Sequence, residues 1–224
     1  MLVKFGNWLF HYRNILFPVF YAALFIPSLP ISPDYRWSII SGSLFIALGI
    51  VTRGVTIGLV YIVRGGNKRQ IHADTLVTGG VYQICRNPMY LGNILLIIGF
   101  GLFANSLLFL TLFSSLFVLF YIAIIRAEED FLLTKFGGQF EAYKSFANAL
   151  LPKLSRLKNA FSGHRFDFKR VINKEHNSLF LYFSGILLLL WYQHLISWRV
   201  LLFIFSPLLI IYLYVKLLKK EKKL

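Results

Sequence analysis

Long runs of apolar residues, separated by short polar segments, constrain the fold of this chain more than any other feature. Hydrophobic residues make up 57% of the 224 residues, charged residues only 15%, and the mean hydropathy is +0.65. Inside a bilayer every backbone N–H and C=O must find a partner within the protein, which leaves helices and closed barrels as the spanning structures. The apolar runs are closer to the length of a membrane-spanning helix than to that of a barrel strand. The sequence therefore predicts an all-α, polytopic integral membrane protein.

Six apolar runs predict about six transmembrane helices. They cover residues 15–29, 37–63, 90–103, 107–125, 178–196 and 200–215. The first run is short and holds two prolines, but no small-residue cleavage site follows it, so we expect a kinked transmembrane helix rather than a signal peptide. Only the tripeptide Ala-Asn-Ser separates the third and fourth runs, which predicts an antiparallel helical hairpin with almost no loop.

The segment 126–152 differs from these runs because apolar and charged residues alternate along it. Its apolar side chains recur every three or four residues, at Leu132, Phe136, Phe140, Tyr143 and Ala147. This is the spacing of one face of a helix. We therefore expect an amphipathic helix at the membrane interface, broken near Gly137 and Gly138.

The distribution of positive charge predicts the orientation of the helices. The net charge is +15, and all but three of the 24 Lys and Arg residues fall on the side of the predicted bundle that holds both termini. Arg36 and Arg199 fall on the opposite side, and Arg53 lies inside a span. By the positive-inside rule both termini face the cytoplasm. Basic residues used in this way contact membrane lipids, and we expect no nucleic-acid partner.

Two basic segments in the C-terminal part are predicted to face lipid headgroups. One is the tail KLLKKEKKL, which has the composition of an electrostatic anchor to anionic lipid. The other, 153–177, contains the possible metal ligands His164, Asp167, Glu175 and His176. Their spacing matches no ordinary metal site, so we predict no bound metal. Cys85 is the only cysteine, so no disulfide forms within the chain.

The stretch TLVTGGVYQICRNPMYLGN, residues 75–93, gathers polar and turn-forming residues just before the third run. Pro88 fixes one backbone dihedral and pushes Asn87 out of the helical region. Arg86, Asn87 and Tyr90 are thereby held at a bend. From composition alone this is a juxtamembrane loop with a helix-starting proline and an arginine that reaches the interface.

A second polar cluster, Glu128, Glu129 and Asp130, follows the fourth run, and the predicted hairpin makes the two clusters neighbours. A sulfonium cofactor with an amino-acid tail has an ammonium that needs a carboxylate, a carboxylate that needs an arginine, and an adenine that needs aromatic or apolar walls. The two clusters offer all three. The alternative for the acidic residues is a solvated helix start.

Two ordered patterns in these clusters carry a family resemblance. The first consists of Gly80, Tyr82, Arg86, Pro88, Tyr90 and Gly92, and the second of Glu128, Glu129, Phe136, Gly137 and Tyr143. Over residues 75–152 the chain resembles the S-adenosylmethionine-binding half of the membrane isoprenylcysteine carboxyl methyltransferases and the related phospholipid methyltransferases. It departs from them at Asn87, where the family commonly has histidine.

The resemblance implies S-adenosylmethionine as cofactor and assigns the residues that bind it. The pocket would be lined by Tyr82, Arg86, Asn87, Pro88 and Tyr90. Glu128 and Glu129 would lie at its polar end. Gly99 and Gly101 correspond to glycines beside the cofactor in phospholipid methyltransferases, although glycines at this spacing also permit close helix packing.

Two residues are predicted to act in catalysis. Arg53 lies deep in the second span, where it could hold an anionic substrate group or pair with Asp74 or a glutamate. Glu129, or Asp130 beside it, would serve as general base if the acceptor is a protonated amine or a thiol. Asn93 lies one residue past the first pattern, and we expect it to pack rather than to face the pocket.

The expected function is methyl transfer from S-adenosylmethionine to a lipophilic acceptor at the cytoplasmic face, the acceptor being a carboxylate, amine or thiol of a lipid or prenylcysteine-like compound. The alternatives are an NADPH-dependent reductase of the membrane sterol-reductase type and a non-catalytic, lipid-binding helical bundle. The expected organisation is N-terminal spans with a loop (1–74), a methyltransferase core (75–152), a basic linker (153–177) and two C-terminal spans (178–224).

Overall fold

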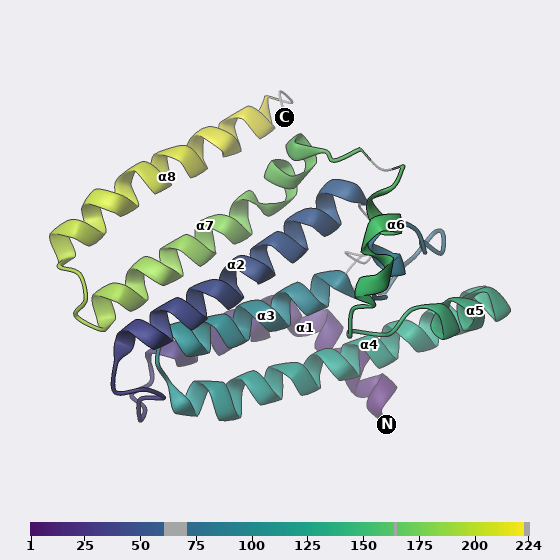
Figure 1. Ribbon diagram of the computed structural model, residues 1–224, viewed down its shortest axis with the longest axis horizontal. Helices are drawn as coiled ribbons and strands as arrows, with labels where there is room; N and C mark the ends of the chain where they lie inside the picture. Colours follow the sequence, from purple (N-terminus) through teal and green to yellow (C-terminus); the bar gives the residue numbers. More distant parts are fainter. Residues whose placement is uncertain (61–70, 164, 222–224) are drawn as a thin grey trace. The chain divides into compact units, whose positions relative to one another are not determined.

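A computed structural model describes residues 1–60, 71–163 and 165–221, and within these ranges the chain is helical with no strand (Figure 1). One isolated β-bridge joins Pro30 to Ser106. The prediction of an all-α fold is confirmed. The α-helices are α1 (Leu2–Ala22), α2 (Tyr35–Leu59), α3 (Pro88–Phe103), α4 (Ser114–Phe136), α5 (Gly138–Phe146), α6 (Leu157–Phe161), α7 (Phe168–Tyr192) and α8 (Trp198–Lys220). Short turns precede or follow them: η1 (Ala23–Phe25), η2 (Gly80–Gln83), the π-helical η3 (Phe109–Phe113) and η4 (Leu154–Arg156).

Three of the described helices are long and apolar enough to cross a membrane: α2, α4 together with η3, and α8. The apolar helix α3 is shorter. The remaining spans of the six-span prediction, and its orientation, stay predictions. The sequence predicts the first span over residues 15–29. The helix there, α1, begins earlier, at Leu2, continues through Pro18 and ends at Ala22, and residues 26–29, contrary to the prediction, are not helical. The predicted end of the second span at residue 63 lies outside the described residues.

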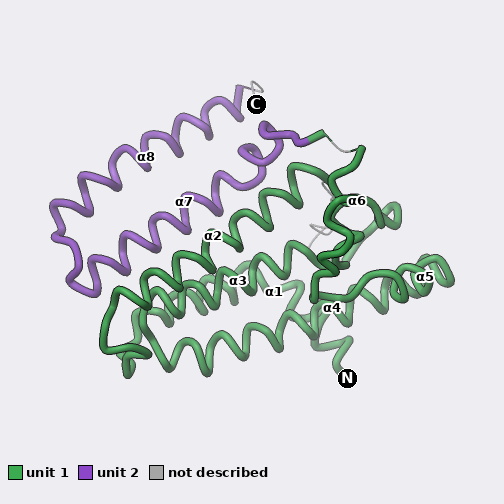
Figure 2. The backbone as a smooth tube through the Cα atoms, in the orientation of Figure 1, with its two compact units in different colours: residues 1–165 green, residues 166–224 purple. Residues whose placement is uncertain are grey.

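The chain forms two compact units, residues 1–165 and residues 166–224 (Figure 2). The first holds α1 to α6 and the second consists of the α7–α8 hairpin. The division of the chain into four functional parts stays a prediction.

Helices α2 and α3 are in backbone contact within the first unit. A Cβ atom added at Gly42 would lie 2.4 Å from the backbone nitrogen of Phe103, and one added at Gly99 would lie 2.7 Å from the backbone nitrogen of Ile46. Only glycine permits such an approach. The helices run antiparallel, because residues late in α3 face residues early in α2. This contact carries Arg53 of α2 over Gly92 of α3, where a Cβ would lie 2.6 Å from the arginine Cγ.

The reversal between α3 and α4 is a tight turn held by Asn105, as the sequence predicts. Asn105 adopts a positive φ of 52°, a conformation that asparagine tolerates better than most residues. Its Oδ1 accepts hydrogen bonds from the backbone N–H of Ile31 and Ser32 and from the Ser38 hydroxyl. The turn therefore also fixes the loop that leads into α2.

Helix α4 continues to Phe136, so the acidic cluster lies in its C-terminal half. The break predicted near Gly137 is confirmed: Gly137 has a φ of +51° and separates α4 from α5. Glu128 and Glu129 are 4% and 7% exposed. The alternative of a solvated helix start for these carboxylates is therefore wrong, and two buried charges at this point need partners.

Candidate active site

The segment 84–87 is fixed by backbone hydrogen bonds to the segment 148–153. The N–H groups of Arg86 and Asn87 donate to the carbonyls of Asn148 and Ala149 over 2.8 and 3.1 Å, and the N–H of Lys153 donates to the Ile84 carbonyl over 3.0 Å. The Asn87 side chain adds a bond from Nδ2 to the Ala149 carbonyl over 3.1 Å. The Asn87 backbone lies outside the helical region (φ −129°, ψ 60°), and Pro88 is the first residue of α3, as predicted. The Asn87 amide, which stands where the family commonly has histidine, is thus hydrogen-bonded to the Ala149 carbonyl.

Arg86 and Glu129 form a buried ion pair. The side chains are each 9% exposed, and Arg86 Nε lies 3.2 Å from Glu129 Oε1, which also accepts a bond from Arg86 Nη2. Arg86 Nη1 donates to the carbonyls of Ala147 and, over 3.3 Å, Lys144. This single guanidinium therefore joins the bend before α3, helix α4 and the end of α5. Removing one partner of such a pair leaves an uncompensated buried charge.

The neighbouring carboxylate, Glu128, is engaged differently. Its Oε1 accepts a hydrogen bond from the Tyr90 hydroxyl over 2.6 Å. Glu128 and Glu129 are adjacent on α4 but bind a phenol and a guanidinium, respectively. The two acidic residues that the sequence places together therefore have distinct environments, and with Arg86 and Tyr90 they connect the start of α3 to α4.

Polar side chains extend from this point into the helical bundle. Arg53 of α2 donates to Asn93 Oδ1 of α3, and Asn93 Nδ2 lies 2.7 Å from the Tyr121 hydroxyl of α4. The Tyr121 ring stands 4.8 Å from the Tyr90 ring, centroid to centroid. We call the set Arg53, Asn93, Tyr121, Tyr90 and Glu128 the polar bridge. It places a cation from α2 and a carboxylate from α4 in one chain of contacts.

Sequence reasoning missed Tyr121, which is 2% exposed in an apolar helix. The available signal was its position seven residues before Glu128, because residues two turns apart lie on one face of a helix. The packing role expected for Asn93 agrees with its bonds to Arg53 and Tyr121. The sequence also predicts Asp74 as a possible partner for Arg53. Its Oδ1 lies 2.9 Å from His72 Nε2, and the Asp74 side chain is 86% exposed.

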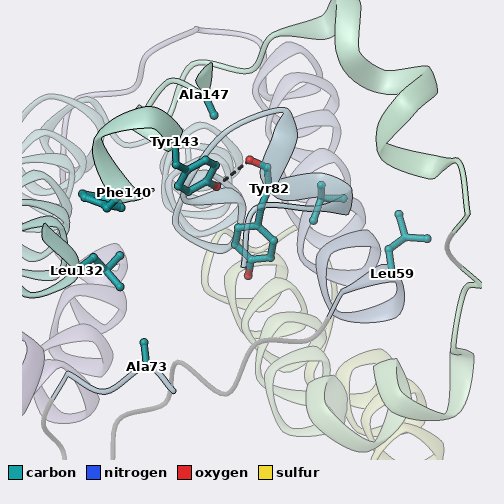
Figure 3. Close-up of a cluster of buried hydrophobic side chains, with 8 residues drawn as sticks. Leu59, Ala73, Tyr82, Leu132, Phe140, Tyr143 and Ala147 are labelled. Carbon is teal, nitrogen blue, oxygen red and sulfur yellow. Dashed lines mark hydrogen bonds between the residues drawn. The ribbon is translucent and has the colours of Figure 1, made fainter. Parts of the chain in front are cut away.

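Figure 3 shows an apolar cluster that includes Ala147, whose carbonyl accepts a hydrogen bond from Arg86 of the ion pair. The Tyr143 hydroxyl donates to the Tyr82 carbonyl over 2.8 Å, so the phenol of α5 fixes the turn η2. The buried members of the cluster are Leu59, Ala73, Val81, Tyr82, Leu132, Phe140, Tyr143 and Ala147. The cluster supplies apolar and aromatic side chains near the ion pair, and the cofactor pocket that the sequence predicts here stays a prediction.

Gly99 and Gly101 lie at close contacts between helices. Gly99 faces the backbone of Ile46, and a Cβ at Gly101 would lie 2.8 Å from Cδ1 of Phe109. Helix packing, the alternative that the sequence allows for these two glycines, thus explains both of them. Their role beside a cofactor stays a prediction.

Cys85, next to the ion pair, is 1% exposed. Burial raises the pKa of its thiol to about 11, so the sulfur stays protonated near neutral pH and is a poor nucleophile. Among the described residues no group of three His, Cys, Asp or Glu side chains is placed to hold a metal ion. The polar groups described at this site are carboxylates, guanidinium groups, amides and phenols.

These polar groups fit S-adenosylmethionine, the cofactor that the sequence resemblance implies. S-adenosylmethionine carries a sulfonium, an ammonium, a carboxylate and an adenine, and the site combines carboxylates, Arg86 and an apolar cluster. Arg86 is already bound by Glu129, whereas Glu128 is held by a phenol. Glu128 is therefore better suited than Glu129 to face the cofactor's cationic groups.

Comparison with known proteins identifies the family of this region. Residues 37–139 match the family model described as phospholipid methyltransferase. The chain is similar to the cobalt-zinc-cadmium resistance protein CzcN of Cupriavidus metallidurans, with 38% identity over 101 residues, and to the nickel-cobalt-cadmium resistance protein NccN of Alcaligenes xylosoxydans xylosoxydans, with 35% identity over 97 residues. These matches cover 44% and 42% of this chain and 46% and 45% of the relatives. The chain thus spans less than half the length of the curated relatives it matches. No solved structure matches.

The matched region contains the whole polar bridge and the Arg86–Glu129 pair, and it ends within α5. The α7–α8 hairpin lies outside it. The resemblance read from the two polar clusters is confirmed, because residues 37–139 match the phospholipid methyltransferase family model.

Proposed function

We propose that the chain transfers a methyl group from S-adenosylmethionine to a lipophilic acceptor in the membrane. The family domain supports a membrane methyltransferase. The observation that carries the proposal is the pairing of adjacent carboxylates on α4 with Tyr90 and Arg86 at the start of α3. It sets an acidic group, a guanidinium and an apolar cluster beside one another, as a cationic amino-acid cofactor requires.

The cofactor supplies an activated, cationic methyl donor. The protein then has to bind it, align the acceptor and keep water out. Glu128 would hold the cationic groups, with Tyr90 orienting its carboxylate. Arg86, with Glu129, Asn87 and Pro88, would fix the wall of the pocket, and Tyr82 would add an aromatic surface. We further propose that the cofactor enters from the cytoplasmic side and the acceptor from the bilayer.

The polar bridge suggests a role for Arg53 towards the acceptor. Its guanidinium is bound to Asn93 on α3, inside the bundle, and its stem packs on Gly92. An intramembrane cation fixed in this way is suited to an anionic headgroup or carboxylate. We propose that Arg53 holds such a group, while Tyr121 and Asn93 set its position. Because Glu129 is bound to Arg86, a general base would more readily be Glu128.

The relatives' names offer a physiological context. CzcN and NccN are named for resistance to cobalt, zinc, nickel and cadmium. We propose that methylation by this chain contributes to tolerance of such metals. A host strain sensitive to cadmium should gain tolerance from the wild-type chain and less from Glu128→Gln. Equal cadmium tolerance with the wild-type chain and with Glu128→Gln would show that metal resistance does not depend on this site.

The direct test is transfer of a labelled methyl group from S-adenosylmethionine to membrane lipid extracts by the purified chain. Label in the lipid fraction, lost in Glu128→Gln, is the expected result. A chain that binds NADPH and not S-adenosylmethionine would point to the reductase alternative, and one that binds neither would point to a non-catalytic bundle.

A further inference from the structure

All described Lys and Arg residues of the second unit except Arg199 gather at one end of its hairpin. Helices α7 and α8 run antiparallel, so the first turns of α7 lie beside the last turns of α8. Lys219 Nζ donates to the Asn173 carbonyl over 3.2 Å, and the Tyr212 hydroxyl donates to Asn177 Oδ1 over 3.0 Å. The Tyr212 ring also stacks on Phe180 with centroids 4.3 Å apart. These contacts join segments that are distant in the sequence.

The two ends of this hairpin differ in charge. We call the following six side chains the basic end: Lys169, Arg170, Lys174, Lys216, Lys219 and Lys220. Three acidic residues accompany them, and one of these, Asp167, pairs with Arg170 at 3.0 Å. The opposite end carries the single cation Arg199 and the exposed aromatic residues Trp191 and Trp198. A surplus of positive charge thus lies at one end only.

The lysines of α8 are interleaved with exposed leucines on one face. Leu213, Lys216, Leu217 and Lys220 are spaced by three and four residues and therefore form one stripe along the helix. Together with Lys219 they line a shallow, open groove. No residue of α8 is buried. A ligand that fits this stripe has an anionic part for the ammonium groups and an apolar part for the leucines.

We infer that the basic end is a binding surface for the headgroups of anionic phospholipids. Helix α8 is long and apolar enough to cross a bilayer, so its terminal lysines would lie at headgroup depth and its leucines at acyl-chain depth. A free phosphate would use the lysines but leave the leucines in water, which is why we assign a lipid. The surface lies outside the matched domain and is independent of the proposed methyl transfer.

The test titrates the full chain, purified in neutral detergent, with phosphatidylglycerol and follows the rise in unfolding temperature. The triple variant Lys216→Gln, Lys219→Gln, Lys220→Gln should need about tenfold more lipid for half of the shift, because each lysine contributes separately to the attraction. The matched control removes three exposed lysines of the first unit, Lys4, Lys144 and Lys158, and should behave like the wild type. Replacing the three α8 lysines by arginine should preserve binding.

Three outcomes would overturn the inference. Equal losses in the two glutamine variants would mean that only net charge matters. Equal shifts with phosphatidylcholine would remove the role of the anionic headgroup. Displacement of the lipid by inorganic phosphate at matched ionic strength would identify a small-anion site instead. Binding of phosphatidylglycerol that resists phosphate, weakens with added salt and depends on the α8 lysines would support it.

Discussion

The matched domain and helix α8 differ in where their polar groups lie. In the domain, Arg86, Glu128 and Glu129 are all less than a tenth exposed, and each has a hydrogen-bonded partner on another element. Helix α8 of the hairpin buries no residue and carries its lysines near its C-terminal end, although its neighbour α7 buries Glu175 and His176. Burying charge is unfavourable unless it is paired, and these paired buried groups are what make the domain the candidate binding site.

The largest effect is expected from breaking the ion pair of the domain. Arg86→Ala removes the buried partner of Glu129, leaves Glu129 with the exposed Arg126 at 3.8 Å, and should cost about 3–5 kcal/mol of unfolding free energy. Cofactor affinity should fall at least about tenfold with it. Chemical unfolding in detergent and calorimetry measure the two effects. The double variant Arg86→Met, Glu129→Leu removes both charges and should recover most of the stability but not the binding; no recovery would contradict the account of Arg86 as the partner of Glu129.

Matched hydroxyl deletions compare the two regions directly. Tyr90→Phe removes a bond to a buried carboxylate and should cost about 1.5–3 kcal/mol, whereas Tyr212→Phe removes a bond to an exposed amide and should cost about 0.5 kcal/mol. Unfolding of both variants under one condition gives the comparison. Equal costs would show that the Tyr90–Glu128 bond is no stronger than a surface bond.

Helix packing in the domain can be tested separately from its polar groups. Gly99→Ala places a methyl group 2.7 Å from the α2 backbone and should cost about 1–3 kcal/mol. Gly138 is a matched control, because a Cβ there meets nothing within 4 Å. Unfolding of Gly99→Ala and Gly138→Ala should therefore differ clearly. A neutral Gly99→Ala would mean that α2 and α3 are not in backbone contact.

The smallest effect on binding is expected at Arg53. Arg53→Leu should leave the affinity for S-adenosylmethionine within about threefold of wild type but lower turnover at least about tenfold, because Arg53 is proposed to hold the acceptor. Calorimetry and labelled-methyl transfer measure the two quantities. Arg53→Lys keeps the charge and should retain part of the turnover. Loss of folding in both variants would return Arg53 to a structural role.

The sequence predicted the parts of the fold that local chemistry determines. The turn at Asn105, the break at Gly137 and the proline-started helix after Asn87 depend on residues that restrict the backbone, so they are readable from the chain. The neighbourhood of the two polar clusters followed from the short α3–α4 hairpin. These predictions needed no knowledge of distant contacts.

Long-range partners could not be predicted in the same way. The acceptor of the Asn87 amide is the Ala149 carbonyl, 62 residues away, and nothing in either segment specifies the other. Nor does the sequence tell which of two adjacent glutamates binds Arg86, because that depends on the rotation of α4. Tyr121 was missed for the same reason: it lies among apolar residues, and the rotation of α4 decides that it faces Asn93.

The central claim is that the paired carboxylates of α4 belong to a cofactor site, and calorimetry with S-adenosylhomocysteine, the demethylated product, tests it most directly. We expect the wild-type chain to bind this compound and Glu128→Gln, which keeps the shape of the side chain, to bind it at least about tenfold more weakly with unchanged unfolding. Wild-type affinity in Glu128→Gln, or no binding by the wild-type chain, would contradict it.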